Sequence, residues 1–306
     1  MIAKGTRPNE CIRTIANRHH HLLDGVVEMS ARKPPHALRP SNPAGPCEPR
    51  ILRVDRIALI CEPWEWPFTS RCRGAIDAYF RREKRANSSL WNGRLLLVRD
   101  LHVVDGALRG RCFETDYASL LAGLARSDIG HHVKACLGVA ALMGSDGAFI
   151  VGRMGPYTRN AGQMYLPSGS FDRKDVIAGK LDVLGSIWRE LREETGLVPD
   201  GLVADPDWHV VFAGPRVPLF KVVRASEPAD VVRSRMVANL ASQKRPEFVA
   251  IEVVRSHQLD PRMPPWMQSY LRHAWGGLAG TNRVCGRIQG RNALTPRRSR
   301  EDGCDT

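Results

Sequence analysis

The chain has 306 residues, of which 43% are hydrophobic and 25% are charged, and its formal net charge is +13. These proportions are ordinary for a soluble globular protein. No uncharged apolar run approaches the roughly eighteen residues of a membrane span, and charged side chains interrupt the region where a secretory signal needs an apolar core. We therefore expect a cytoplasmic protein without a membrane segment. The eight cysteines include no C-x-x-C pair, so neither a disulfide framework nor a zinc site is expected.

Both ends of the chain, residues 1–50 and 276–306, are expected to be poorly ordered basic tails. Residues 32–50 contain six prolines, too many for a helix or a central strand. Residues 276–306 are rich in glycine, arginine and asparagine and show no periodicity. Arginines cluster at 297, 298 and 300 without interleaved aromatic residues, so a solvated tail is preferred over a nucleic-acid site.

The first folded segment, residues 51–130, predicts strands and helices in alternation. Asp105 and Gly106 separate two apolar runs, which is a strong hairpin signal. Asp116 is a candidate N-cap. The predicted elements are a strand at 51–61, a helix at 71–84, strands at 95–104 and 107–113, and a helix from 116 to 126. Small core positions are expected at Cys61, Cys112 and Cys136.

The second folded segment, residues 131–275, predicts strands on both sides of one amphipathic helix. Proline residues at 228 and 264–265 can open two further helices. Strands on both sides of a helix favour an α/β fold with a mixed sheet packed between helices. The predicted elements are strands at 132–143, 148–152, 208–212, 219–223 and 248–254, and helices at 229–240 and 266–275.

Residues 189–197 form the most informative pattern, Arg-Glu-Leu-Arg-Glu-Glu-Thr-Gly-Leu. On a helix, with about 100° per residue, Glu190, Glu193 and Glu194 share one edge. Three crowded carboxylates repel one another, and Mg²⁺ or Mn²⁺, which favours oxygen ligands, would neutralise them. A solvated helix surface rich in Glu and Arg is the alternative. An adjoining apolar stripe that would seat the helix on a sheet comprises Leu184, Ile187, Trp188 and Leu191.

The order Arg-Glu-apolar-x-Glu-Glu-x-Gly-apolar matches the second half of the Nudix box at every position, so the chain resembles the Nudix hydrolases. The resemblance implies an α/β/α sandwich and hydrolysis of a nucleoside diphosphate linked to another moiety. It also implies Mg²⁺ or Mn²⁺ bound mainly by Glu190 and Glu194, with Glu193 completing the site or binding a second ion. Arg189 is expected to orient these carboxylates.

The first half of the box departs from the family pattern. Asp175 and Leu181 occupy the positions of an expected glycine and glutamate. The turn that resembles the family's proline–glycine turn contains Gly169, a candidate substrate contact, twenty residues before Arg189 instead of fourteen. We interpret the difference as an insertion within residues 172–181, which would place Asp182 near the missing glutamate.

The loop at residues 152–163 leads into the box and carries the candidate substrate contacts. Glycines allow a backbone to approach phosphates closely, and the fork of an arginine matches phosphate oxygens. Arg153 and Arg159 are therefore candidates for the diphosphate, and Tyr157 is a candidate for stacking on a base or sugar. An ordinary surface loop rich in Gly and Pro is the alternative.

The general base is predicted to be Glu193 or Glu247, the latter at the mouth of a strand, because Nudix enzymes differ in where this group lies. Glu252 lies in the middle of the same strand and is expected to face the sheet surface. Residues 51–130 are additional to a minimal Nudix domain. Their short run Leu90-Trp91-Asn92-Gly93 resembles the leading segment of Nudix proteins that act on UDP- or GDP-sugars; a helix, hairpin and helix that merely pack on the domain are the alternative.

These features predict a Nudix-type pyrophosphohydrolase acting on a small-molecule nucleotide, either a nucleotide sugar or ADP-ribose. A basic excess suits such a polyanionic substrate. A catalytically silent nucleotide-sensing module is one alternative, and the complete set of three glutamates disfavours it. An RNA-directed, decapping-type hydrolase is another, favoured only by the basic tails. The sequence leaves the formation of a homo-oligomer open.

Overall fold

A computed structural model of the chain describes residues 48–125, 132–255 and 259–281. The predictions for the proline-rich segment up to residue 47, and for the basic tail from residue 282, lie outside these residues. Within the described ranges, no helix is long and apolar enough to cross a membrane.

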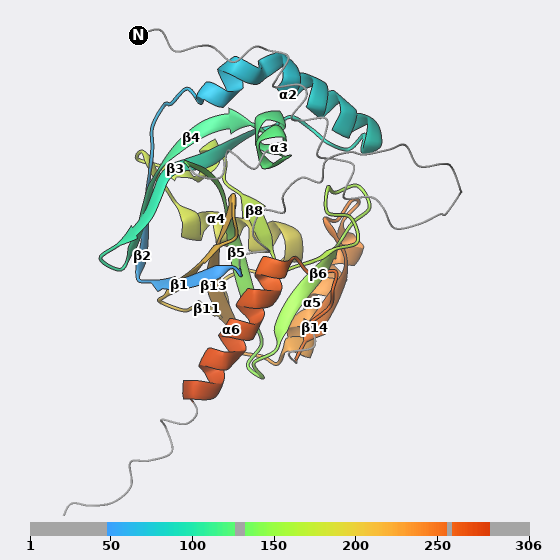
Figure 1. Cartoon of the computed structure of the whole chain (residues 1–306). Coiled ribbons are helices and arrows are strands. Elements are labelled where there is room, and N and C mark those ends of the chain that lie inside the picture. The colour runs from blue at the N-terminus through green and yellow to red at the C-terminus, as the bar shows by residue number, and fades with distance from the viewer. Residues whose placement is uncertain (1–47, 126–131, 256–258, 282–306) are drawn as a thin grey trace, which may run out of the picture.

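Strand β5 (Val133–Met143) joins two mixed sheets at the centre of the fold (Figure 1). Its first residues pair antiparallel with β3 (Arg94–Val104), and the rest pairs in parallel with β13 (Arg216–Ala225). The strand order is β1-β12-β13-β5-β3-β4-β2-β10-β9. The other strands of this order are β1 (Arg50–Val54), β12 (Trp208–Phe212), β4 (Ala107–Asp116), β2 (Arg56–Cys61), β10 (Lys180–Leu181) and β9 (Val176–Ile177).

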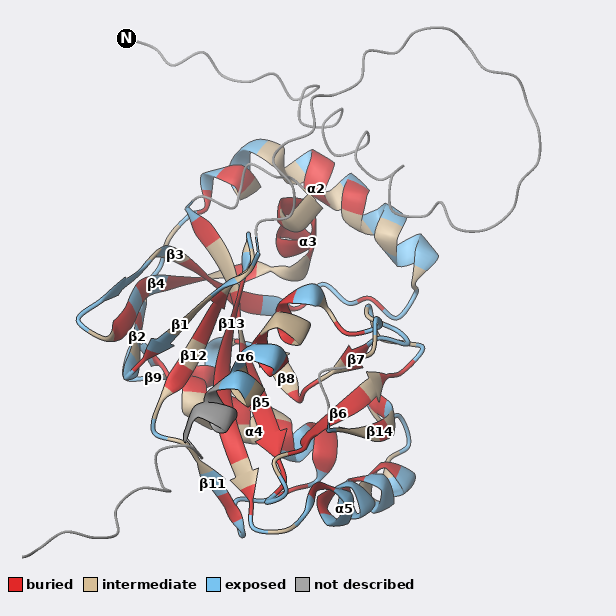
Figure 2. Ribbon diagram, turned by 60° about the horizontal axis from the view of Figure 1, so that its bottom comes forward, coloured by how far each residue is buried: buried red, intermediate tan, exposed pale blue. Residues whose placement is uncertain are grey.

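Helices cover both faces of the sheet around β5. Alternate residues of a strand point to opposite faces. Ala140 and Leu142 contribute to a core with α4 (Val183–Thr195) and α5 (Ala229–Ser242), whereas Val139 and Ala141 contribute to a core with α6 (Pro265–Thr281). Figure 2 shows the buried positions concentrated on the strands, while the outer side of α5 is exposed. The predicted α/β/α sandwich with a mixed sheet is confirmed.

The first segment packs a core of its own and also shares the sheet of the second. Helices α2 (Pro67–Ala86) and α3 (Tyr117–Ala125) lie over β3 and β4 (Figure 1) and bury Ile76, Phe113 and Leu121 between them. Strand β1 pairs with β12, so hydrogen bonds join the first segment to the second.

The prediction of a single strand at residues 51–61 is wrong, because Asp55 interrupts the strand. Here the backbone N–H of Asp55 donates to the carbonyl of Gly106 at 2.8 Å. Strand β1 precedes the break and enters one sheet, whereas β2 follows it and pairs in parallel with β4. One apolar run therefore supplies strands to two different sheets.

Residues 172–181 fold into a 3₁₀ turn, η2 (Arg173–Asp175), followed by the short hairpin β9–β10. Strand β10 pairs with β2, so this segment packs on the first part of the chain. Asp182, the residue predicted to lie near the missing glutamate, has a capping role. Its carboxylate caps α4 by accepting a 2.9 Å hydrogen bond from the N–H of Gly185, two helical turns away from Glu190.

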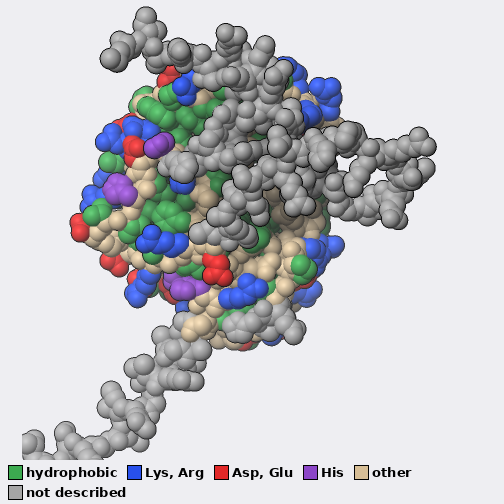
Figure 3. Space-filling view, viewed as in Figure 1, with side chains coloured by type: hydrophobic (Ala, Val, Ile, Leu, Met, Phe, Trp, Pro, Cys, Tyr) green, Lys and Arg blue, Asp and Glu red, His purple; other side chains and the backbone are tan. Residues whose placement is uncertain are grey.

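The remaining strands pair beside the main order. They are β6 (Phe149–Met154), β7 (Met164–Tyr165), β8 (Ser168–Ser170), β11 (Leu202–Ala204) and β14 (Phe248–Val254). Strands β6 and β14 lie next to α5 and pair antiparallel with each other, and β7 pairs with β6. Strand β8 pairs with β5, and β11 pairs with β13. On the face drawn in Figure 3, the coloured Lys and Arg side chains are interspersed with Asp and Glu.

Candidate functional site

Helix α4 carries the predicted carboxylates, and its sequence explains where it begins and ends. Asp182 caps its first turn, and Gly196 ends it with φ of 74°, a left-handed conformation that glycine adopts without strain. Ile187 and Leu191 are buried against the sheet. Packing of this apolar face leaves Glu190 and Glu194 along the side of the helix that borders a hollow.

The hollow next to α4 has a volume of about 710 Å³ and is lined by both parts of the chain. Glu190 and Glu194 lie in its wall together with Glu247, which directly precedes β14. The first segment contributes Trp91, Arg94 and Tyr117, and the second contributes Arg159, Tyr165 and Arg245. Carboxylates, guanidinium groups and aromatic rings from distant parts of the sequence therefore share one concave surface.

Removal from water dominates the electrostatics of these carboxylates. Glu194 is 4% exposed and accepts a 2.9 Å hydrogen bond from the N–H of Ser168. Burial, followed by the charges of Glu247 and Glu190, raises the pKa of Glu194 well above its usual range. Burial also raises the pKa of Glu190 to about 7, against the opposing effect of Arg189. The pKa of Glu247 is raised by desolvation within the hollow and then by Glu193.

Arg189 contacts three carboxylates and does not itself line the hollow. Its guanidinium donates to Glu190 at 2.8 Å and to Asp175 at 2.9 Å, and it lies 3.5 Å from Glu193. Burial by itself lowers the pKa of Arg189, but the hydrogen bond to Asp175 and the charge of Glu190 raise it overall. Arg189 thus has the position of a group that orients carboxylates rather than one that contacts a substrate.

Asp175 is the residue that sequence reasoning missed. The pattern treated it only as a replacement for an expected glycine, yet it is 5% exposed and is the buried partner of Arg189. Its other role is local: its carboxylate accepts from the N–H of Asp172 at 2.9 Å, which completes a capping box at η2. The Asp-x-x-Asp spacing at residues 172–175 was the available signal.

Gly169 lies on β8 directly against α4. A Cβ atom at this position would lie 2.2 Å from Cδ of Glu190, far inside van der Waals contact. Any side chain here would displace the Glu190 carboxylate. Gly169 therefore shapes the hollow through the close approach of its backbone to the glutamate.

The three candidates of the 152–163 loop have different positions. Arg153 shares a face of β6 with Val151, which packs in the α6 core, so the structure does not support its predicted place at the diphosphate. Tyr157 lines the hollow, but its hydroxyl donates to the carbonyl of Pro246 and the guanidinium of Arg245 lies 4.5 Å from its ring centroid. One face of this ring is therefore already covered.

Arg159 is the loop residue whose guanidinium is best placed for an anionic ligand. It is exposed, lines the hollow and lies 3.6 Å from Glu83 of α2. The two candidate bases also differ, because Glu247 lines the hollow while the Glu193 side chain is 56% exposed and lies outside the lining. Glu252 faces away and lies 3.8 Å from Arg262.

The donor set fits a hard divalent cation, although it is not preassembled. Across the described ranges, no three His, Cys, Asp or Glu side chains are grouped as a formed metal site. Glu190, Glu194 and Glu247 nevertheless line one hollow with raised pKa values, and oxygen donors are those that Mg²⁺ and Mn²⁺ prefer. Neither Glu194 nor Glu247 has an ion-pair partner within the described residues.

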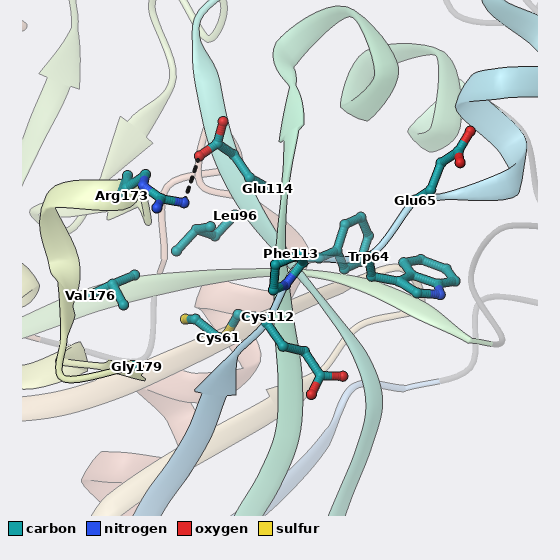
Figure 4. A pocket seen from close by; sticks show the side chains of 12 residues that line it. Cys61, Trp64, Glu65, Leu96, Cys112, Phe113, Glu114, Arg173, Val176 and Gly179 are labelled. Carbon is teal, nitrogen blue, oxygen red and sulfur yellow. Dashed lines mark ion pairs between the residues drawn. The ribbon is translucent and has the colours of Figure 1, made fainter.

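Arg173, Val176 and Gly179 help to line a second hollow of about 630 Å³ (Figure 4). Its wall is mainly apolar and includes Leu96, Phe113 and Val176 next to the sulfur atoms of Cys61 and Cys112. Cys112 and Cys136 are buried, which confirms their predicted core role, whereas Cys61 is half-buried. Cys72, on α2, is disulfide-bonded, which the cysteine spacing did not predict.

Two acidic side chains of this second hollow, Glu62 and Glu114, are paired with arginines, whereas Glu65 accepts a hydrogen bond from Ser70. Glu114 lies 3.6 Å from Arg173, and Glu62 lies 3.2 Å from Arg111 and also pairs with Arg99. The two hollows therefore differ in charge compensation more than in size.

No protein-family profile matches the chain, and no curated protein sequence matches it. Similar solved structures include a Nudix hydrolase from M. smegmatis, RenU, with 14% identity and a TM-score of 0.31 over 52% of this chain and 89% of that chain. An Ap4A hydrolase from C. elegans has 15% identity and a TM-score of 0.35 over 47% and 98% of the two chains. A MutT protein from Methanosarcina mazei Go1 has 16% identity and a TM-score of 0.30 over 50% and 96%. Similarity at this level carries no conclusion about chemistry.

Proposed function

We propose that this protein is a Nudix-type hydrolase that depends on a divalent cation and cleaves the phosphoanhydride of a nucleoside diphosphate linked to another moiety. The observation that carries the proposal is the convergence of Glu190, Glu194 and Glu247 on one hollow, where Glu194 is 4% exposed. A buried carboxylate without a cationic partner is unfavourable, and a bound cation removes that penalty. Mg²⁺ or Mn²⁺ suits these oxygen donors.

Glu190 and Glu194 are the proposed main ligands. Arg189, which donates to Glu190 at 2.8 Å, holds that carboxylate in place, and the backbone of Ser168 holds Glu194. Glu193 lies beside them, 3.5 Å from Arg189, and is the proposed third ligand or the ligand of a second ion. When bound, the cation would neutralise the diphosphate and polarise the attacked phosphorus.

Glu247 is the proposed general base, in preference to Glu193. Its carboxylate lies in the lining of the hollow, and partial desolvation raises its pKa, which strengthens it as a proton acceptor. It would take the proton of the attacking water as the new P–O bond forms and the bridging P–O bond of the phosphoanhydride breaks, which leaves its electron pair on the departing phosphate. The Glu193 side chain is 56% exposed, lies 3.5 Å from Arg189 and is not part of the lining of the hollow.

A nucleotide sugar or ADP-ribose is the proposed substrate class. The hollow extends from the three carboxylates to Arg159, which can bind phosphate oxygens, and to the side chains of the first segment. Its volume of about 710 Å³ is in the range of small-ligand sites. The first segment therefore enlarges the site beyond what α4 and its own sheet enclose.

A substrate panel on the purified full chain tests this function. ADP-ribose, UDP- and GDP-sugars, dinucleoside polyphosphates, NADH, coenzyme A and capped RNA are supplied with Mg²⁺, with Mn²⁺ or with EDTA. We expect a nucleotide sugar or ADP-ribose to yield a nucleoside monophosphate and a sugar phosphate, and EDTA to abolish turnover. Faster cleavage of coenzyme A or capped RNA would overturn the substrate class. No turnover of any compound would favour the nucleotide-sensing alternative.

A further inference from the structure

Trp91 stands out because it exposes an aromatic ring inside the site. Its side chain is 77% exposed, and the other large hydrophobic side chains exposed by the described residues are all aliphatic. Trp91 lies in the wall of the same hollow as Glu190 and Glu194. An indole left in water buries its apolar surface when a flat ligand covers it.

The loop that carries Trp91 is anchored on both sides. Its next residue, Asn92, accepts a 2.7 Å hydrogen bond from the N–H of Ala118 at the start of α3. On the other side, Ser89 accepts from the guanidinium of Arg245 at 3.1 Å, and Leu90 is 7% exposed. Hydrogen bonds and burial of its neighbours therefore fix the backbone that carries the exposed ring, so the loop loses little conformational entropy when a ligand binds.

Gly93 fixes the orientation of the indole. A Cβ atom at Gly93 would lie 2.4 Å from Cζ3 of Trp91, so the six-membered ring rests directly on the glycine backbone. The carbonyl of Gly93 accepts from the N–H of Tyr117 at 2.9 Å, which holds this backbone in place. One side of the ring is thus backed by the chain, and the exposed surface is available to a ligand.

Trp91 and the carboxylates together indicate the chemistry of the ligand. Arg245 adds a guanidinium without an ion-pair partner within the described part of the chain, 4.5 Å from the ring centroid of Tyr157. A ligand that satisfies all these groups has a flat aromatic ring at one end and phosphates that meet the cation site and an arginine. We propose that Trp91 is the platform on which the nucleobase of the substrate stacks.

The proposal rests on the proposed function, because it assigns the base of the same nucleotide. Stacking on an aromatic side chain tolerates any base, since every base has a π face. The first segment would then contribute binding of the base, while the second contributes the chemistry. Replacement of Trp91 should weaken ground-state and transition-state binding alike, so KM should rise while kcat stays nearly constant.

Binding without turnover provides the test. ADP, UDP and ribose 5-phosphate are titrated into the full chain in EDTA by isothermal calorimetry, with wild type, Trp91→Ala, Trp91→Phe and Gly93→Ala. We expect Trp91→Ala to weaken ADP and UDP about tenfold to a hundredfold. Trp91→Phe should retain most of the affinity, and Gly93→Ala should lose part of it because the added Cβ displaces the ring. Ribose 5-phosphate, which lacks a base, should bind all four proteins alike.

The controls separate this inference from the proposed hydrolase activity. Val203→Ala changes another exposed hydrophobic side chain, on β11 outside the hollow, and should bind ADP as wild type does. Unchanged ADP affinity in Trp91→Ala, an equal loss for ribose 5-phosphate, or no nucleotide binding by wild type would overturn the inference. Base-dependent binding through Trp91 without hydrolysis of any substrate would instead overturn only the activity.

Discussion

Residues 172–181 contribute to the walls of two hollows, of about 710 and 630 Å³, whose acidic side chains differ in their partners. In the smaller hollow, Glu62 and Glu114 each lie within 3.6 Å of an arginine. In the larger hollow, Glu194 and Glu247 have no such partner among the residues that the structure describes, and their pKa values are raised. Size alone does not distinguish a binding site, whereas uncompensated buried charge identifies where a cation is needed.

Residues 172–181 serve both hollows. Asp172 lines the larger hollow, and Arg173 and Val176 line the smaller one. Between them, Asp175 turns inward and holds Arg189 at 2.9 Å. The segment that departs from the Nudix pattern thus contributes to both hollows and also contacts the charged helix.

The largest effect is expected from removing one uncompensated charge. Glu194→Gln keeps the size of the side chain but loses the anion that would hold the cation. Turnover of the best panel substrate with Mg²⁺ should fall by at least about a hundredfold. Glu62→Gln makes the same change in the smaller hollow, where Glu62 is paired with Arg111, and should keep normal turnover. Near-normal turnover of a folded Glu194→Gln protein would remove the metal assignment.

A comparable loss of turnover is expected when Glu247, which lines the same hollow as Glu194, is replaced. Glu247→Gln cannot accept a proton, so kcat should fall about a hundredfold in steady-state kinetics, as for other general bases. Glu252→Gln, in β14 and turned toward Arg262, is the matched control and should leave kcat unchanged. A large loss in Glu193→Gln together with an active Glu247→Gln would reassign the base.

A smaller loss of activity is expected when the ion pair between Asp175 and Arg189 is removed. Asp175→Asn removes the buried charge that holds Arg189, so kcat/KM should fall about tenfold, as for groups that orient metal ligands, and the melting temperature should drop. Arg173→Gln breaks only the exposed pair with Glu114 and should change neither quantity measurably. Equal kinetics for both variants would show that Asp175 does not act through Arg189.

The pH dependence of stability should also separate the two hollows. The pKa of Glu190 rises from 4.5 to about 7 on folding, so the folded state holds the proton of this carboxyl group more tightly than the unfolded state does. The resulting contribution to the free energy of unfolding is fully present below about pH 4.5. That contribution, about 2 to 3 kcal/mol, is lost as the pH rises through about 7. In urea titrations with EDTA, wild type should therefore lose more stability than Glu190→Gln between pH 5 and 8, by about this amount. Glu62→Gln should follow wild type; parallel curves for Glu190→Gln and wild type would contradict the burial effect.

The smallest effect on turnover is expected from modification of the thiols in and near the smaller hollow. A hydrogen bond from Cys112 and the charge of Arg173 lower the pKa of Cys61 against the opposing effect of burial, whereas burial raises the pKa of Cys136 to about 12. Iodoacetamide should therefore alkylate Cys61 before Cys112 and Cys136, as measured by peptide mass spectrometry, with little change in turnover. Loss of activity in step with alkylation of Cys61 would show that the two hollows are coupled.

Local patterns in the sequence predicted most elements of the fold. The Asp-Gly turns at 105–106 and 146–147 separate paired strands as expected, because such turns depend on a few neighbouring residues. The spacing of Glu190, Glu193 and Glu194 also placed them on one helix, since helical periodicity is a local property. The prediction failed at Asp55, where one continuous apolar run changes from one sheet to another. Such a change depends on which distant strands offer free edges.

The sequence by itself determined the acidic helix, its end at Gly196 and the class of cation that its oxygen donors suit. Only the tertiary structure brought Glu247, Arg245 and Trp91 into the same hollow as Glu190. It also turned Arg153 away from this hollow and gave Asp175 its partner Arg189. The physical reason is that helix periodicity and capping act over a few residues, whereas the environment of a charge depends on chain segments far apart in sequence.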